Sequence, residues 1–306
     1  MQSKKNCTFA KTTKNMSISL AITLGVALLV GFLLIRFNST NDEAGKFKKN
    51  LGYVRFDTDA ILTENELNRR INLVGLGKYW QQLEAYMQHD VSFKTEVKSE
   101  AEIALGKSKI GGSPHLNASM EISSENIFFC QINCAELSDL KRNDFFPDKG
   151  MLYFFLNPQK IVQEKTDSVS VLYLENQEDL CLREDAMSMP EVKPCALHFF
   201  QSVSLPDYES EVVQNLLKGY EIDGYFKAVN QEQSHKLFGY PNIISQNFVL
   251  EDDQYLLLQL DSEENSGMLW KNMGRMYIFA NKNDTKKKSF EKITAYIQSY
   301  EGKEDL

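Results

Sequence analysis

The chain contains four histidines, and any chemistry based on an activated nucleophile would have to use His89, His115, His198 or His235. Such chemistry needs an imidazole near a serine or cysteine, and a carboxylate that orients the ring. None of the four lies in the HExxH motif of zinc proteases or near a GxSxG motif. His115 follows a Gly-Gly-Ser-Pro turn, where we expect it to be exposed to solvent. We therefore predict no catalytic residue and no metal site built on histidine.

The Gly-Gly-Ser-Pro turn, residues 111–114, is a candidate phosphate-binding loop, because glycines allow several backbone N–H groups to converge on an anion. A phosphate-binding loop, however, requires Gly-Lys-Ser/Thr leading into a helix, whereas Pro114 removes an N–H donor. We expect a structural turn instead. The glycine fingerprint of dinucleotide-binding proteins does not occur in the sequence, so we predict no cofactor.

Two acidic runs, residues 251–253 and 261–264, could supply oxygen ligands to a calcium ion, which takes about six to eight of them. Neither run has the alternating spacing and the glycine of a calcium-binding loop. We expect solvated loop charges and no metal site. If the domain is instead an enzyme, Asp261 and Glu264 are the reasonable acid–base candidates, and the protein would be a carboxylate-dependent hydrolase or transferase.

Polar residues stand two positions apart at the ends of two apolar segments, and a tyrosine follows each pair. Residues two apart on a strand point to the same face, so each pair places two polar groups side by side. If the two segments pack about a two-fold axis, the pairs meet at the seam and form a polar pocket. The alternative is that the pairs satisfy backbone donors where the strands end, and that the tyrosines are core aromatics. The candidate binding residues are Gln131, Asn133, Tyr153, Gln259, Asp261 and Tyr277.

The segments that would position these residues occur twice along the chain. Three of them recur in the same order, residues 112–114 at 239–241, residues 129–133 at 257–261, and residues 150–155 at 274–279. The offsets lie between 124 and 128 positions and indicate an internal duplication. We interpret residues of about 105–175 and 235–300 as two tandem, diverged repeats.

Each repeat offers a Gly-x-Pro turn, an apolar strand, a polar connection and a second strand that opens at glycine. Further strands are expected at residues 169–174 and 293–300. Because the connections are short, antiparallel pairing is favoured over parallel crossovers. Ahead of the repeats, Thr63 and Glu66 form a capping box that opens a helical region. The predicted fold class is α+β, with mainly antiparallel sheets built from the two repeats.

An apolar stretch at residues 18–35 contains no charge and only Ser19 and Thr23 as polar side chains. As a helix it would reach about 27 Å, close to the hydrocarbon thickness of a bilayer. The alternative is a cleaved signal peptide, whose apolar core usually spans about 7–15 residues before a small-residue cleavage site. Arg36 follows the stretch directly, so we predict a retained, single-pass transmembrane helix at residues 18–36.

The charge distribution bears on topology and partners. Four lysines precede the predicted anchor, so we expect residues 1–17 in the cytoplasm and residues 51–306 outside, joined by a polar linker at 37–50. After the first 36 residues the chain carries 29 basic and 42 acidic side chains. Such an acidic domain disfavours binding to nucleic acid and broad electrostatic binding to anionic lipid. The expected partners are the membrane, through the anchor, and an unidentified protein or small molecule.

The cysteines leave the oxidation state open. Cys7 precedes the anchor, whereas Cys130, Cys134, Cys181 and Cys195 follow it. Four cysteines are compatible with two disulfides outside the cell, but their spacing matches neither a redox motif nor a zinc site. We expect small, buried free thiols.

Taken in order, these motifs resemble the YwqG-like family, a domain family of unknown function. The resemblance is carried by SKIGGSPHL (108–116), FFCQINCAEL (128–137), GMLYFFLNP (150–158), VLYLE (171–175), KLFGYPNII (236–244), LLLQLDSEE (256–264) and WKNMGRMYIFA (270–280). It covers residues of about 95–300 and implies a compact α+β domain without assigned catalytic residues. The chain departs from the family at residues 117–121, where relatives often have Trp-Pro. We expect a membrane-anchored YwqG-like protein with a non-enzymatic binding or interaction role.

Overall fold

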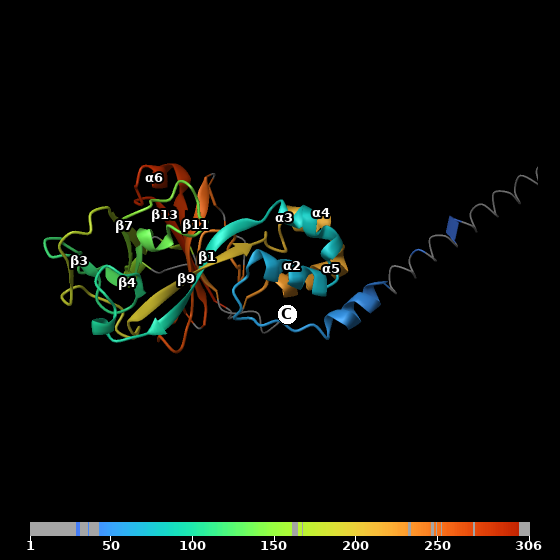
Figure 1. Ribbon diagram of the computed structural model, residues 1–306, viewed down its shortest axis with the longest axis horizontal. Coiled ribbons are helices and arrows are strands. Elements are labelled where there is room, and N and C mark those ends of the chain that lie inside the picture. Colours follow the sequence, from blue (N-terminus) through green and yellow to red (C-terminus); the bar gives the residue numbers. More distant parts are fainter. Residues whose placement is uncertain are drawn as a thin grey trace, which may run out of the picture. The chain divides into compact units, whose positions relative to one another are not determined.

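The computed structural model of the chain describes residues 29–30, 36, 43–160, 165–166, 168–231, 234–245, 248, 250–251, 253–271 and 273–299. The chain divides into two compact units, Met1–Val54 and Arg55–Leu306 (Figure 1). In the first unit, residues 43–51 are helical. The predicted anchor at residues 18–36 lies almost entirely outside the described residues. Within the described ranges, no helix is both long and apolar enough to cross a bilayer.

The second unit is built around one antiparallel sheet, which has 11 strands in the part of the chain that the structure describes. The strands are β1 (Gln88–Val97), β2 (Lys109–Ile110), β4 (Ile127–Asn133), β5 (Met151–Leu156), β6 (Lys165–Thr166), β7 (Val169–Leu174), β9 (Cys195–Ser204), β10 (His235–Leu237), β11 (Gln254–Asp261), β12 (Arg275–Asn281) and β13 (Ile293–Gln298). Their order in the sheet is β6-β13-β12-β11-β10-β1-β9-β2-β4-β5-β7. A separate ribbon pairs β3 (His115–Asn117) with β8 (Leu180–Leu182).

The centre of the sheet is the pair β1 and β9, ten residues each, which bond along their whole length and run side by side in Figure 1. Although β1 precedes β2 in the chain, its second neighbour in the sheet, besides β9, is β10. Conversely, β9 precedes β10 but pairs with β2. At the ends of the sheet, β6 bonds to β13 and is followed in the chain by β7, so the two ends approach each other.

On one side of this centre lie β2, β4, β5 and β7, which we call the first array, and on the other lie β10, β11, β12 and β13, the second array. The strand pairs of the two arrays match in register. Corresponding pairs of facing residues are Lys109–Gln131 and Lys236–Gln259, and then Gln131–Tyr153 and Gln259–Tyr277. Both β4 and β11 also carry one register irregularity at the matching place. The matched residues are separated by the same offsets of 124–128 positions that the sequence shows.

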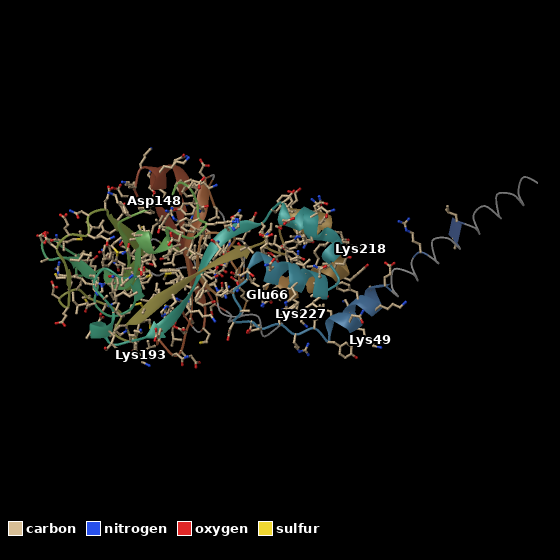
Figure 2. All side chains as sticks on the ribbon, viewed as in Figure 1. Lys49, Glu66, Asp148, Lys193, Lys218 and Lys227 are labelled. Atoms are coloured by element: carbon tan, nitrogen blue, oxygen red, sulfur yellow. The ribbon has the colours of Figure 1, made fainter. Side chains whose placement is uncertain are left out.

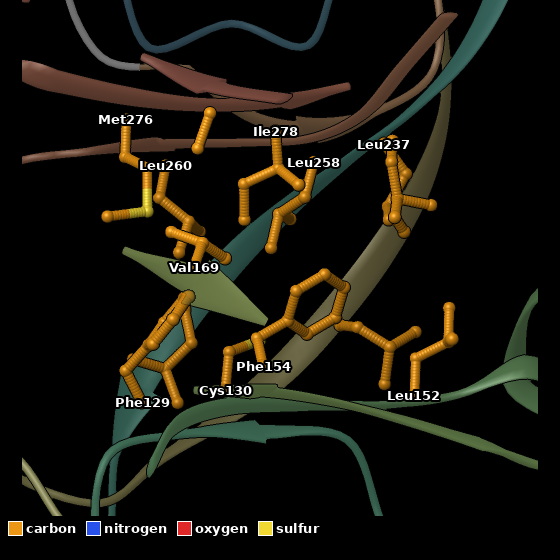
Figure 3. Close-up of a cluster of buried hydrophobic side chains, with 14 of the residues drawn as sticks. Phe129, Cys130, Leu152, Phe154, Val169, Leu237, Leu258, Leu260, Met276 and Ile278 are labelled. Carbon is orange, nitrogen blue, oxygen red and sulfur yellow. The ribbon is translucent and has the colours of Figure 1, made fainter. Parts of the chain in front are cut away.

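The hydrophobic core lies between the two sides of the sheet. Cys130 and Phe154 from one side pack in the same cluster as Leu258 and Ile278 from the other (Figure 3). Cys130, Cys134, Cys181 and Cys195 are free thiols, and all but Cys181 are buried, as expected for the cysteines within the described ranges.

The face of β1 and β9 opposite to this core carries a buried polar cluster. The Ser202 hydroxyl donates to the Asp90 carboxylate and lies 2.8 Å from Ser92 Oγ. Lys236 Nζ lies 3.8 Å from Asp90 Oδ2, and both side chains are buried. Burial raises the pKa of Asp90 and lowers the pKa of Lys236 to about 8, because a charged group loses its hydration there.

Glycine is required where β5 of the first array and β12 of the second array begin. Gly150 precedes β5 and has φ +94°, a conformation that strains residues with a side chain. Gly274 precedes β12, and a Cβ there would lie only 2.0 Å from the carbonyl oxygen of Gln298. The expected glycine at both strand entrances therefore has a physical reason, positive φ in one case and close approach of β13 in the other.

Four helices pack as a group beside one end of the central strands β1 and β9 (Figure 1). They are α2 (Glu64–Leu73), α3 (Trp80–Glu84), α4 (Glu211–Leu216) and α5 (Gly219–Val229), while the short α6 (Lys282–Lys286) follows β12. Thr63 caps α2 as predicted, because its hydroxyl accepts the Glu66 N–H at 3.2 Å, but the Glu66 carboxylate turns instead to Arg69 and Arg70. The predicted fold class is confirmed in its main feature, a mainly antiparallel sheet with few helices.

Asp148, Lys193 and Lys218 are among the exposed charged side chains of the second unit (Figure 2).

Candidate functional site

The first set of predicted binding residues fastens a loop to the sheet. Gln131 is fully buried, and its Oε1 accepts the His115 N–H at 2.9 Å while its Nε2 donates to the Lys107 carbonyl at 2.7 Å. The Tyr153 hydroxyl donates to the His115 carbonyl at 2.6 Å. Asn133 accepts the N–H of the residue two positions on and so caps the following turn. These contacts are of the kind that the alternative interpretation describes, in which the polar pair binds backbone groups near the end of its strand.

In the second set, Gln259 and Tyr277 make the same contacts in the other array. Gln259 Oε1 accepts the Asn242 N–H at 2.9 Å, and its Nε2 donates to the Ser234 carbonyl at 2.7 Å. The Tyr277 hydroxyl donates to the Asn242 carbonyl at 2.6 Å. The hydrogen-bonding groups of these side chains are thus also used within the protein.

Asp261 is held in a buried ion pair. Its two carboxylate oxygens lie 2.5 and 2.7 Å from the Arg275 guanidinium, and Oδ2 also accepts the Ser234 N–H at 2.6 Å. Glu264, the other acid–base candidate, is exposed. A carboxylate whose two oxygens are occupied by these three bonds is poorly placed to exchange protons with a substrate. The structure therefore does not assemble the acid–base pair that the sequence suggested.

The two polar pairs do not meet at a seam, so the first of the two interpretations, a shared polar pocket, does not apply. Cys130 and Leu258 point into the core shared by the two arrays, and the alternation of a strand turns Gln131 and Gln259 away from it. In the sheet, four strands separate β4 from β11. Each glutamine is covered by the loop of its own array.

His115 is buried and not exposed as expected. Its side chain lies against Gln131, and its Nδ1 accepts the Gly106 N–H at 3.0 Å. Loss of hydration, aided by the positive charge of Lys109, lowers the pKa of His115 to about 4. The preceding turn is structural as expected, with Gly111 and Gly112 both at positive φ.

Neither acidic run forms a metal site among the residues that the structure describes. No group of three or more His, Cys, Asp or Glu side chains comes together there in a way that could hold an ion.

A site that the sequence did not predict lies where β10 begins. A cavity of about 230 Å³ opens there, between β1, the chain leading into β10 and the turn after β11. Its walls include Phe93, Thr95, Gln231, Ser234, His235 and Glu263. We call this cavity the His235 pocket.

His235 is held in one tautomer. The ring stacks on Phe93 of β1, with centroids 5.5 Å apart and planes 16° from parallel, and is only 5% exposed. Its Nδ1 accepts the Asp261 N–H at 3.1 Å. Because a backbone N–H can only donate, the proton of the neutral ring must be on Nε2. Burial lowers the pKa of His235, which keeps the ring neutral.

Two of the residues that line the pocket each have one buried polar atom without a partner among the described residues, Nε2 of His235 and Oε2 of Glu263. The other oxygen of Glu263 accepts the Thr95 hydroxyl at 2.6 Å. The Glu263 backbone is fixed by two bonds to Met268, of 2.7 and 3.1 Å. Leaving a polar group buried and unpaired costs roughly 1–3 kcal/mol, so two such groups in one pocket call for a physical reason.

The matching place in the other array shows what the structure alone requires. There, Asn133 N–H donates to Ser108 Oγ at 2.8 Å, as Asp261 N–H donates to His235. A serine is thus enough to make this bond, and the second nitrogen of His235 is not needed for it. Likewise, Ala135 stands where the second array has Glu263. Both unpartnered groups therefore belong to one array only.

The tautomer decides what chemistry the His235 pocket can perform. Nε2 carries a proton, so it can donate a hydrogen bond but offers no lone pair to a metal ion or to a proton. His235 therefore cannot serve as general base for Thr95, whose hydroxyl is in any case directed at Glu263. The pocket presents one fixed donor and one fixed acceptor, an arrangement suited to holding a ligand.

The second unit is thus a mainly antiparallel domain with a small polar pocket where β10 begins. The family model described as a domain of unknown function (DUF1963) matches residues 108–298, which is more than half of the 306 residues. The chain therefore belongs to this family. The matched span includes His235 and Glu263, whereas β1, which supplies Phe93 and Thr95, precedes it. A search among curated proteins gave no match.

Proposed function

We propose that the domain is a non-enzymatic binding module that takes a small polar ligand in the His235 pocket. The observation that carries this proposal is that two residues lining one cavity each keep a buried, unpartnered atom, the Nε2–H donor of His235 and the Oε2 acceptor of Glu263. A ligand that pairs with both would recover much of the desolvation cost of roughly 1–3 kcal/mol at each atom. In the unliganded protein, no hydrogen bond offsets this desolvation cost.

The hydrolase or transferase alternative has less support. It relied on Asp261 and Glu264, and Asp261 is bound to Arg275 while Glu264 is exposed. Enzyme sites bring together titratable groups whose pKa values are moved towards the working pH. In the His235 pocket, by contrast, burial moves the pKa of the only histidine downwards and away from neutrality.

The membrane anchor at residues 18–36, with residues 1–17 in the cytoplasm and the domain outside, is a further part of the proposal. It is supported by the uncharged apolar run and by the lysines that precede it. We also propose that the two strand arrays arose by duplication, since their registers and their Gln and Tyr contacts match at the sequence offsets. The assignment to the YwqG-like proteins depends on the same motifs.

A fragment experiment tests the binding role. A library of small polar compounds is screened by ligand-observed NMR against the full-length chain in a mild detergent. The double variant His235→Ser/Glu263→Ala copies the residues at the matching place in the other array, Ser108 and Ala135. We expect a group of compounds to bind the unaltered chain and to lose binding in the double variant.

The matched control is Ser108→Ala, which removes the corresponding backbone bond from the other array. It should leave the same compounds bound. If the double variant binds the same compounds as the unaltered chain, or if no compound binds at all, the His235 pocket is not a ligand site.

A further inference from the structure

We infer that the ligand of the His235 pocket is a small organic amine that also carries an oxygen acceptor, with its cationic nitrogen on Glu263 and its oxygen on His235. This inference rests on the proposed function and specifies the class of compound that the pocket takes. Amino alcohols and amino-acid amides have this combination of groups.

The first argument is charge. The pocket is lined by two carboxylates, Glu263 and Asp59, and by one ammonium group, Lys94. Asp59 and Lys94 are both exposed, whereas Oε2 of Glu263 is buried and has no partner in the described chain. The neutral His235 ring adds no positive charge. An anionic ligand would therefore meet an acidic site, while an ammonium group would pair with the free oxygen through a charge-assisted hydrogen bond.

The second argument is the direction of the hydrogen bonds. His235 Nε2–H requires an oxygen or nitrogen lone pair on the ligand, since its own lone pair is not available. A bare metal cation can satisfy Glu263 but not His235, because a cation placed at Nε2 would face its proton. The same ligand must therefore carry a donor for Glu263 and an acceptor for His235. An inorganic cation and a simple carboxylate each supply only one of the two.

The third argument is size. The cavity of about 230 Å³ is smaller than the roughly 300–1,000 Å³ of pockets that hold drug-sized ligands. The Phe93 ring, stacked on His235, gives the pocket one apolar wall that the carbon atoms of a short amine can contact. The site thus suits a molecule of a few non-hydrogen atoms, or the amine end of a longer one.

Three probes of similar size separate the possible classes. Glycinamide carries an ammonium group and a carbonyl, and propionamide keeps the carbonyl without the ammonium group. Glycolate carries a hydroxyl and a negatively charged carboxylate. Binding is followed in the full-length chain in detergent through the ring signals of ¹³C-labelled histidine, of which the chain has four. The measurement is made near pH 6.5, where an α-amino group with a pKa of about 8 is protonated.

We expect glycinamide to shift one histidine signal saturably, and that signal to be the one missing in His235→Ser. Glu263→Gln keeps the shape of the side chain and removes its charge, so it should weaken glycinamide binding roughly tenfold, because charge-assisted bonds are about twice as strong as neutral ones. Glu263→Ala, the residue type at position 135, gives a second test if the Gln variant does not fold. Circular dichroism establishes folding for each variant.

The outcomes distinguish this inference from the proposed function. If propionamide or glycolate shifts the His235 signal as strongly as glycinamide, or if Glu263→Gln has no effect, the amine class is wrong while the pocket stands as a binding site. If none of the three probes shifts the signal, the amine class is also wrong. The binding role itself is then decided by the fragment library alone.

Discussion

Replacing His235 tests whether the ring is present for the fold or for its free nitrogen. In His235→Ser, the serine hydroxyl can accept the Asp261 N–H as Ser108 Oγ accepts the Asn133 N–H at 2.8 Å. In His235→Ala, that buried N–H loses its acceptor, which costs roughly 1–3 kcal/mol. Both variants lose the stacking on Phe93, worth about 0.5–1.5 kcal/mol, and both lose the unpaired Nε2. These shared effects cancel when the two variants are compared.

We therefore expect His235→Ser to be more stable than His235→Ala by about 1–3 kcal/mol. The free energy of unfolding of both variants is measured by urea denaturation of a chain that lacks residues 1–37. Ser108→Ala is measured in the same way and should lose about as much stability as separates His235→Ala from His235→Ser, because it removes the matching hydrogen bond. Two-state behaviour is checked by comparing circular dichroism with tryptophan fluorescence. Equal stabilities of the Ser and Ala variants would refute the reasoning, since the Nδ1 contact would then not fix the tautomer of His235.

Four further predictions follow from other parts of the chain. Removal of residues 1–37 should give a soluble, folded protein, since the second unit has its own core; aggregation of this chain, with the full-length protein folded in detergent, would show dependence on the removed segment. A cysteine introduced at Ser39 should react in intact cells with a reagent that cannot cross membranes, and protection until lysis would reverse the proposed topology. Gly274→Ala should destabilise the fold by several kcal/mol, because its Cβ would lie 2.0 Å from a backbone oxygen, whereas Gly219→Ala, with open space around it, should be within about 1 kcal/mol of the unaltered chain in the same urea assay. His115 stays neutral in the folded protein down to a pKa of about 4 but takes up a proton below 6.5 when unfolded, so stability should fall as the pH drops from 6.5 to 4; His115→Asn, the residue type at the matching position 242, should remove up to about 3 kcal/mol of this loss, and an unchanged pH profile would contradict it.

Strands such as β5 and β12 could be predicted from the sequence because their residues are apolar almost throughout and a glycine precedes each of them. β5, for example, has all six residues buried, and Gly150 precedes it. The two central strands could not. β1 and β9 alternate apolar side chains with buried polar ones such as Asp90, Ser92 and Ser202, so neither reads as the apolar run of a central strand. What stabilises these residues is a hydrogen-bonded cluster between strands more than 100 positions apart, which no local pattern reveals.

The site was predicted only in part for a related reason. Gln131 and Gln259 were recognised by their repeated setting, and the structure shows each fastening a loop of its own array. The His235 pocket depends on contact between β1 and a segment about 140 residues later. The one signal in the sequence was the difference between the repeats, where His235 stands at the position matching Ser108. Its meaning depends on the Nδ1 contact with Asp261, which only the folded chain forms.

The pairing of β1 with β10 and of β9 with β2 has a consequence for how the protein folds and can be divided. Each array receives its innermost strand from the stretch of chain that precedes the other array, as protomers do in a strand-exchanged dimer. Neither array can complete its hydrogen bonding before residues from both ends of the domain have come together, so the domain must gain its stability as one cooperative unit. A chain cut between β9 and β10 should therefore yield two fragments that are unfolded apart and become folded only as a pair.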